Sequence, residues 1–141
     1  MAAINGRRVL YGALAGGVVW NLWSMGINQL VLGPHYAAAQ QAGAMLAQPR
    51  YPFFVGQWIL MLFVASYIVA WIYASVRATR GAGPRTAFRV GIFVGFLAGF
   101  PSNFAMATWS PLPRIFPLWW MMELWVGAIL ATLVAGWIYR E

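Results

Sequence analysis

One carboxylate lies within apolar sequence, and its position makes it the first candidate for chemistry. Glu123 is the only acidic residue apart from the terminal Glu141, and it falls within the hydrophobic stretch 116–139. A charged side chain in such a stretch costs free energy unless it faces a protein interior, a partner or water. Glu123 is therefore either a proton-titrating or cation-binding group, or a structural hydrogen-bond acceptor held by Asn103, Gln57 or Arg114.

Other polar and aromatic side chains are expected at the same depth. At a helical rise of about 1.5 Å per residue, they fall in the half of the membrane opposite the arginine-rich segments. We expect a polar vestibule that opens to the outer side and contains a small set of residues. The set is Glu123, Gln57, Asn21, Asn103, Arg114, Trp58 and Trp125. The tryptophans could stack against a flat ligand or simply fill the protein interior, and the asparagines could bind a ligand or bridge helices.

Catalysis finds little support in the sequence. The chain has no cysteine and one histidine, His35, so a metal site with several convergent ligands is not predicted. Axial ligation of a haem or chlorin by His35 is left open, and no cofactor is assigned. There is no nucleophile elbow, zinc-protease motif, phosphate-binding loop or paired acid dyad. The sequence favours a non-enzymatic protein.

The composition is that of a membrane protein. Of its 141 residues, 62% are hydrophobic and only 8% are charged, whereas soluble domains have about a quarter of their residues charged. Four segments are long enough to cross a bilayer, at about residues 9–32, 52–76, 88–109 and 116–139. The predicted fold is therefore an all-α, four-helix membrane bundle that forms one domain over residues 1–141.

The arginines predict the orientation of these spans. Seven fall on one side of a four-span topology, and only Arg50 and Arg114 fall on the other. Because cytoplasmic loops carry an excess of positive charge, both termini are expected on the cytoplasmic side of the membrane. The membrane itself is expected to be a bacterial inner membrane. This layout also argues against nucleic acid as the partner of a chain with a net charge of +7.

Small residues recur at helical spacing and predict close helix packing. The residues are Gly17, Gly91, Gly95, Gly99 and Gly127. Such stripes let two backbones approach each other. The pattern leaves open whether the contacts form within one chain or between copies in an oligomer.

The four predicted spans also repeat in pairs. A shift of 82 positions places Gly17 on Gly99 and Asn21 on Asn103. A shift of 66 positions places Gln57 on Glu123. The sequence thus predicts two hairpins related by tandem duplication with the same orientation, which is a parallel repeat.

Three functions are compatible with these features. The first is an accessory membrane subunit or a module that binds a small ligand or lipid at the vestibule around Glu123, with a homo-oligomer or a membrane-protein partner. The second is a small transporter or channel in which Glu123 couples a proton or cation. The third is a membrane enzyme that acts on a lipid or a quinone. None of the motifs is specific enough to name a family.

Overall fold

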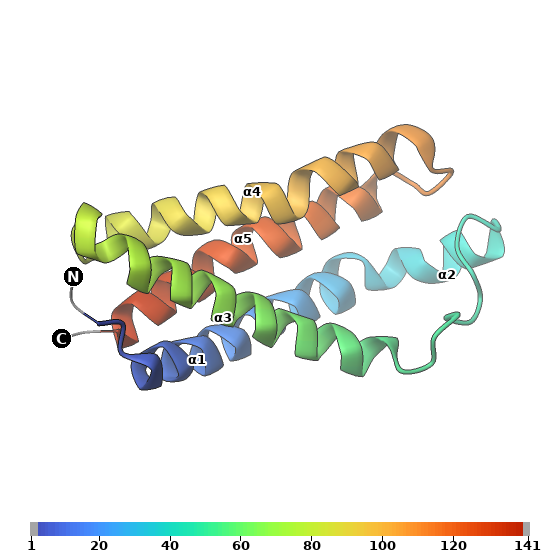
Figure 1. Ribbon diagram of the computed structural model, residues 1–141. Coiled ribbons are helices and arrows are strands. Elements are labelled where there is room, and N and C mark those ends of the chain that lie inside the picture. The colour runs from blue at the N-terminus through green and yellow to red at the C-terminus, as the bar shows by residue number, and fades with distance from the viewer. Residues whose placement is uncertain (1–2, 140–141) are drawn as a thin grey trace.

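The computed structural model describes residues 3–139, and every regular element in that range is a helix. The long helices are α1 (Gly6–Gly26), α3 (Phe54–Arg80), α4 (Pro84–Trp109) and α5 (Ile115–Ile138). They alternate in direction, so the start of α1 and the end of α5 lie at the same end as the turn between α3 and α4 (Figure 1). The expectation of an all-helical protein is confirmed.

Three of these helices are long and apolar enough to cross a membrane. They are α3, α4 and α5, with mean hydropathies of 2.2, 1.6 and 1.7 over their most apolar windows. Only about a third of each window is buried within the protein, so most of its apolar side chains face outward, as they do in lipid. The chain is a small membrane protein. The first helix, α1, does not meet the same criterion.

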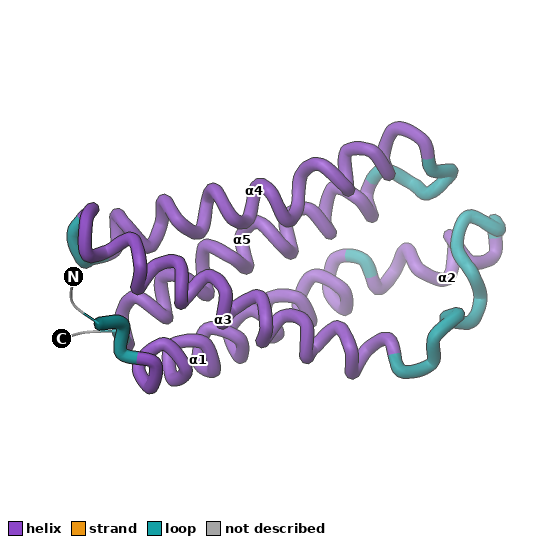
Figure 2. Tube along the Cα trace, viewed as in Figure 1, coloured by secondary structure: helices purple, strands orange, loops and turns teal. Residues whose placement is uncertain are grey.

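The first helix does not end cleanly at Gly26. It passes through a π-helical turn, Ile27–Val31, and then into the short helix α2 (Gly33–Gln41), so that the three form a nearly continuous rod (Figure 2). The apolar side chains of this rod meet the first turns of α5, where Ile27, Leu32 and Phe116 are buried together. The rod therefore covers the α5 end that carries Glu123.

Glycines bring α4 against the backbone of α5. A Cβ atom built on Gly91 would lie 2.6 Å from the Cα of Ile129, and one on Gly95 would lie 2.7 Å from the carbonyl oxygen of Trp125. One on Gly99 would lie 2.8 Å from the carbonyl oxygen of Met121. Since real Cβ atoms do not come this close, these positions require glycine for the observed packing. The Gly91–Gly95–Gly99 stripe faces another helix of the same chain.

The first helix packs into the groove between α3 and α5 in a similar way. A Cβ on Gly16 would meet the Ser66 hydroxyl at 2.7 Å and the carbonyl oxygen of Ala131 at 2.8 Å. Ser66 is fully buried and donates a hydrogen bond of 2.8 Å to the Ala13 carbonyl oxygen. Contacts of this kind place α1 close to α5, and they position the polar side chains of both helices at one level.

Candidate functional site

Glu123 lies at the junction of three helices. It projects from the third turn of α5 and is 1% exposed. The hydroxyl of Ser24 on α1 donates a hydrogen bond to Oε1 of the carboxylate. The indole Nε1 of Trp58 on α3 donates a second hydrogen bond to the same oxygen at 2.9 Å, and lies 3.4 Å from the Ser24 hydroxyl. One carboxylate oxygen thus links α1, α3 and α5.

Two further tryptophans bind the backbone around the carboxylate. Trp20 donates to the carbonyl oxygen of Glu123 itself at 3.1 Å, and Trp23 donates to that of Met122 at 3.2 Å. Gly127 makes room for Trp20, because a Cβ at that position would overlap the indole nitrogen. The tryptophans of α1 therefore act here as hydrogen-bond donors that attach α1 to α5.

A polar chain extends from the carboxylate toward α2. The side-chain amide of Asn28 donates to the Ser24 carbonyl oxygen at 2.9 Å, and the Tyr36 hydroxyl donates to Oδ1 of Asn28 at 2.6 Å. Asn28 belongs to the π-helical turn, a local irregularity that occurs often at functional sites. Ser24, Asn28 and Tyr36 thus connect the buried centre to α2.

The charge of Glu123 affects the pKa of Tyr36. Burial raises the pKa of the Tyr36 phenol, and the negative charge of Glu123 acts in the same direction, against a lowering by the Trp120 side chain. The ring of Tyr36 also packs on Phe116, with centroids 5.2 Å apart. Tyr36 and Phe116 therefore form an aromatic pair between α2 and the start of α5, which we call the aromatic cover.

The two carboxylate oxygens differ in their surroundings. Both hydrogen bonds from side chains go to Oε1, and no described residue donates to Oε2. Both donors are neutral, so the carboxylate is held without an ion pair to any residue that the structure describes. Oε2 is not a fully buried atom without a partner, since Arg8 Nη1 is the one described side-chain atom of that kind. A hydrogen-bond donor, a proton or a cation would stabilise such a carboxylate oxygen. Oε2 is the atom of this centre that could receive one of them.

Of the residues expected around the vestibule, the structure brings Glu123 and Trp58 into contact. Gln57 and Arg114 are exposed and make no hydrogen bond to the carboxylate. Trp125 packs edge-on against Phe96 of α4, at a centroid distance of 5.4 Å.

The two asparagines make similar local contacts. Asn21 donates to the carbonyl oxygen of Gly17 at 2.9 Å, and more distantly to that of Ile59 at 3.5 Å. Asn103 is buried and donates to the carbonyl oxygen of Gly99 at 2.8 Å. Neither asparagine donates a hydrogen bond to Glu123 in the structure.

Glu123 is 1% exposed in the structure, and Ser24 and Trp58 lie against its carboxylate. The expected vestibule stays a prediction. Ser24 and the tryptophans of α1 were not predicted as donors to this centre, because apolar helices give no direct signal of which face meets which neighbour.

The described residues contain no group of three or more His, Cys, Asp or Glu side chains that could hold a metal ion. His35 is exposed on α2. No protein-family model matches the chain, and no curated protein or solved structure matches it.

Proposed function

We propose that the protein is a non-enzymatic binding module of the membrane, in which Glu123 holds a small group through Oε2. The observation that carries this proposal is a buried carboxylate whose described side-chain partners, Ser24 and Trp58, both donate to its other oxygen. The bound group is a hydrogen-bond donor of a small ligand or lipid, or a cation. The aromatic cover formed by Tyr36 and Phe116 would exclude water from it.

The proposal includes four membrane spans, with α1 as the first. Its support is the position of α1, which packs along α3 and α5 and contributes Trp20 and Ser24 to the buried centre. The excess of arginine at one end supports an orientation with that end in the cytoplasm, in a bacterial inner membrane. A parallel repeat is supported by Asn21 and Asn103, which donate to Gly17 and Gly99 in the same way.

Binding is favoured over catalysis by the chemistry around the carboxylate. General acid–base catalysis requires a second group with which a substrate can react, within hydrogen-bonding reach of the first. The side chains that touch the Glu123 carboxylate are an indole and a serine hydroxyl, and both are occupied in holding it. This geometry suits recognition of a donor better than turnover of a substrate.

Transport is less favoured because the packing on the arginine-rich side of Glu123 is tight. Gly12 and Gly16 of α1 lie against the α5 backbone at Ala135 and Ala131. The buried hydroxyl of Thr132 in the same region donates to a carbonyl oxygen of its own helix at 2.6 Å. A proton or cation that reached Glu123 would meet backbone and methyl groups beyond it.

A partner or a second copy is part of the proposal, and it would dock on apolar side chains rather than on the glycine stripe. Gly91, Gly95 and Gly99 face α5 of the same chain. The stacked rings of Phe96, Phe100 and Phe104 on α4 remain at the surface, with centroids 5.0 and 5.5 Å apart. A membrane-protein partner would cover rings of this kind.

The test is native mass spectrometry of protein extracted from its own membrane in a mild detergent. The wild-type protein is expected to retain a bound species that Glu123→Gln loses, while the variant keeps its helical circular dichroism spectrum. Arg114→Gln, at an exposed position, is the matched control and should retain the species. Equal occupancy of the wild type and Glu123→Gln, or none in either, would show that Glu123 has only a structural role.

A further inference from the structure

The end of the molecule opposite Glu123 contains two adjoining cavities. The larger has a volume of about 420 Å³ and lies where the ends of α3 and α5 meet the start of α4. The smaller, of about 160 Å³, lies between α3 and the segment before α1. Arg77, Ala82 and Tyr139 line both cavities, so the side chains of Arg77 and Tyr139 stand between them.

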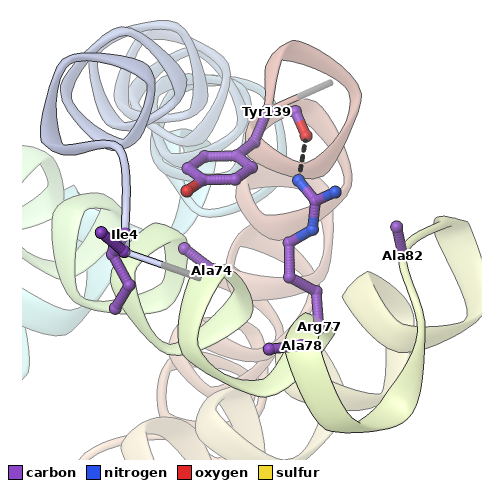
Figure 3. Close-up of a pocket in the computed structure, with 7 residues that line it drawn as sticks. Ile4, Ala74, Arg77, Ala78, Ala82 and Tyr139 are labelled. Atoms are coloured by element: carbon purple, nitrogen blue, oxygen red, sulfur yellow. Dashed lines mark hydrogen bonds between the residues drawn. The ribbon is translucent and has the colours of Figure 1, made fainter. Parts of the chain in front are cut away.

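Arg77 is held in a fixed position at this boundary. Its Nη1 donates to the carbonyl oxygen of Tyr139 at 2.8 Å, and its guanidinium carbon lies 4.8 Å from the centre of the Tyr139 ring. Figure 3 shows the side chain reaching from α3 to the end of α5, beside Ala74 and Ala78. A guanidinium fixed in this way loses little further side-chain entropy when an anion binds.

The charge around the cavities is strongly positive. The last turn of α3 carries Arg77 and Arg80, and the first turns of α4 carry Arg85 and Arg89. Arg8 at the start of α1 adds a further cation, and its Nη1 is buried without a hydrogen-bond partner among the described residues. Glu123, the one carboxylate that the structure describes, belongs to the opposite end of α5, and the sequence has one further acidic residue, Glu141, after Tyr139. Arginines outnumber acidic residues here, so this end attracts anions.

The start of α4 adds to the positive electrostatic potential at this end. Gly83, with φ of 129°, turns the chain into the helix, and Pro84 occupies its first turn. Both residues line the larger cavity, so the positive end of a 26-residue helix is directed there. The Tyr73 hydroxyl accepts a hydrogen bond from the Gly83 amide at 3.1 Å and fixes this turn.

The rest of the larger cavity is apolar. Ala87, Leu133 and Trp137 line it on the side of α4 and α5, and Trp137 is 65% exposed. A small, hydrated anion would gain no binding free energy from these apolar side chains. An anionic group attached to a hydrocarbon chain would gain from both parts of the cavity.

We propose that the two cavities around Arg77 bind the phosphate group of an anionic membrane lipid, with the start of its acyl chain against Leu133 and Trp137. The phosphate lies at the level of Arg77 and the start of α4, where charge-assisted hydrogen bonds form. A soluble phosphate ion carries the same group and is the alternative ligand. The apolar lining of the larger cavity favours the lipid. This site is separate from Glu123 and does not depend on the function proposed for that residue.

The experiment uses the full chain in detergent, with phosphatidylglycerol and phosphatidylcholine of identical acyl chains and, separately, inorganic phosphate. Native mass spectrometry is expected to show phosphatidylglycerol retained over phosphatidylcholine. Arg77→Gln should weaken that binding about tenfold or more, since hydrogen bonds to charged groups have this magnitude. Arg89→Gln, which removes the same charge outside the cavity lining, should weaken it by less than about threefold.

Three results would overturn the proposal. They are an absence of preference between the two lipids, equal losses in Arg77→Gln and Arg89→Gln, and thermal stabilisation by inorganic phosphate as large as that by phosphatidylglycerol. Because Arg77 also holds the end of α5, a second variant, Leu133→Phe, fills the apolar part of the cavity and leaves Arg77 in place. That variant is expected to lose phosphatidylglycerol as well, and unchanged retention would contradict the assignment.

Discussion

The indole nitrogen of Trp58 lies 2.9 Å from Oε1 of Glu123. This hydrogen bond connects residues 54–61, which we call the outer part of α3, to α5. Of residues 53–61, every one is exposed except Trp58. This part of α3 therefore has few contacts with the other helices, and the indole–carboxylate hydrogen bond is the principal one. Below it, from Leu62 onward, α3 is packed into the protein.

We predict that Trp58→Phe loosens the outer part of α3. The variant keeps an aromatic ring but removes the donor, and a hydrogen bond to a charged group contributes about 1.5–3 kcal/mol. The expected result is a lower midpoint of thermal unfolding in detergent and faster amide hydrogen exchange in residues 54–61. Trp109→Phe is the control, since Trp109 is 87% exposed. If both variants behave alike, the contact does not hold α3.

The glycine stripe of α4 gives a second prediction. Gly95→Ala introduces a methyl group 2.7 Å from the Trp125 carbonyl oxygen, and two helix backbones must separate to accept it. Overpacking of this kind costs about 1–3 kcal/mol. Gly56→Ala, in α3, is the matched control because nothing lies within 4 Å of its added methyl group. It should be neutral or slightly stabilising, since alanine favours helix. Thermal unfolding of both variants measures the difference.

The two glycines also show how far the sequence could predict the packing. Gly91, Gly95 and Gly99 recur every four residues, and this spacing alone indicates a helix face that approaches another backbone. Spacing could not identify α5 as that neighbour, because any helix with a smooth face would fit. Gly56 has no such spacing and has open space around it.

The site was predictable to a similar extent. A single acidic residue in an apolar helix already marks Glu123, whatever its partners. Which of the expected residues would touch it could not be predicted, because Gln57 and Trp58 are neighbours in the sequence yet point to different sides of α3. A rotation of α3 by about 100° about its axis would exchange them. That rotation is set by tertiary packing, for example by Ser66 against Ala13, and not by local sequence.

Tyr36 gives a prediction about pH. Burial and the nearby charge of Glu123 raise the pKa of its phenol above the usual value of 10.0. The folded state then holds the phenol proton more tightly than the unfolded state. The stabilisation is complete below the unfolded pKa and is lost as pH rises through the higher folded pKa. Stability of the wild type should therefore decrease with pH from about pH 10 upward, by at most about 1.4 kcal/mol per pH unit for one proton.

The variant Tyr36→Phe removes this titration and should decrease less steeply over the same range. Its cost at neutral pH is the hydrogen bond to Asn28, about 1 kcal/mol. Tyr51→Phe is the control, since Tyr51 is 58% exposed and lies outside the helices. The measurement is thermal unfolding at neutral pH and at about pH 11. Identical alkaline slopes for the wild type and Tyr36→Phe would contradict the prediction.

The absence of cysteine from the chain allows a direct test of the number of spans. Ile4, Leu46 and Ala82 are exposed and lie before α1, after α2, and between α3 and α4. If α1 crosses the membrane, Ile4→Cys and Ala82→Cys will react with an impermeant maleimide from one side, and Leu46→Cys will react from the other. If only α3, α4 and α5 cross, Ile4→Cys and Leu46→Cys will react from the same side. We expect the first result for two reasons. The arginines that flank α1 lie on the same side as those that flank the α3–α4 turn. In addition, α1 supplies Ser24 to a centre that α3 and α5 carry within the membrane.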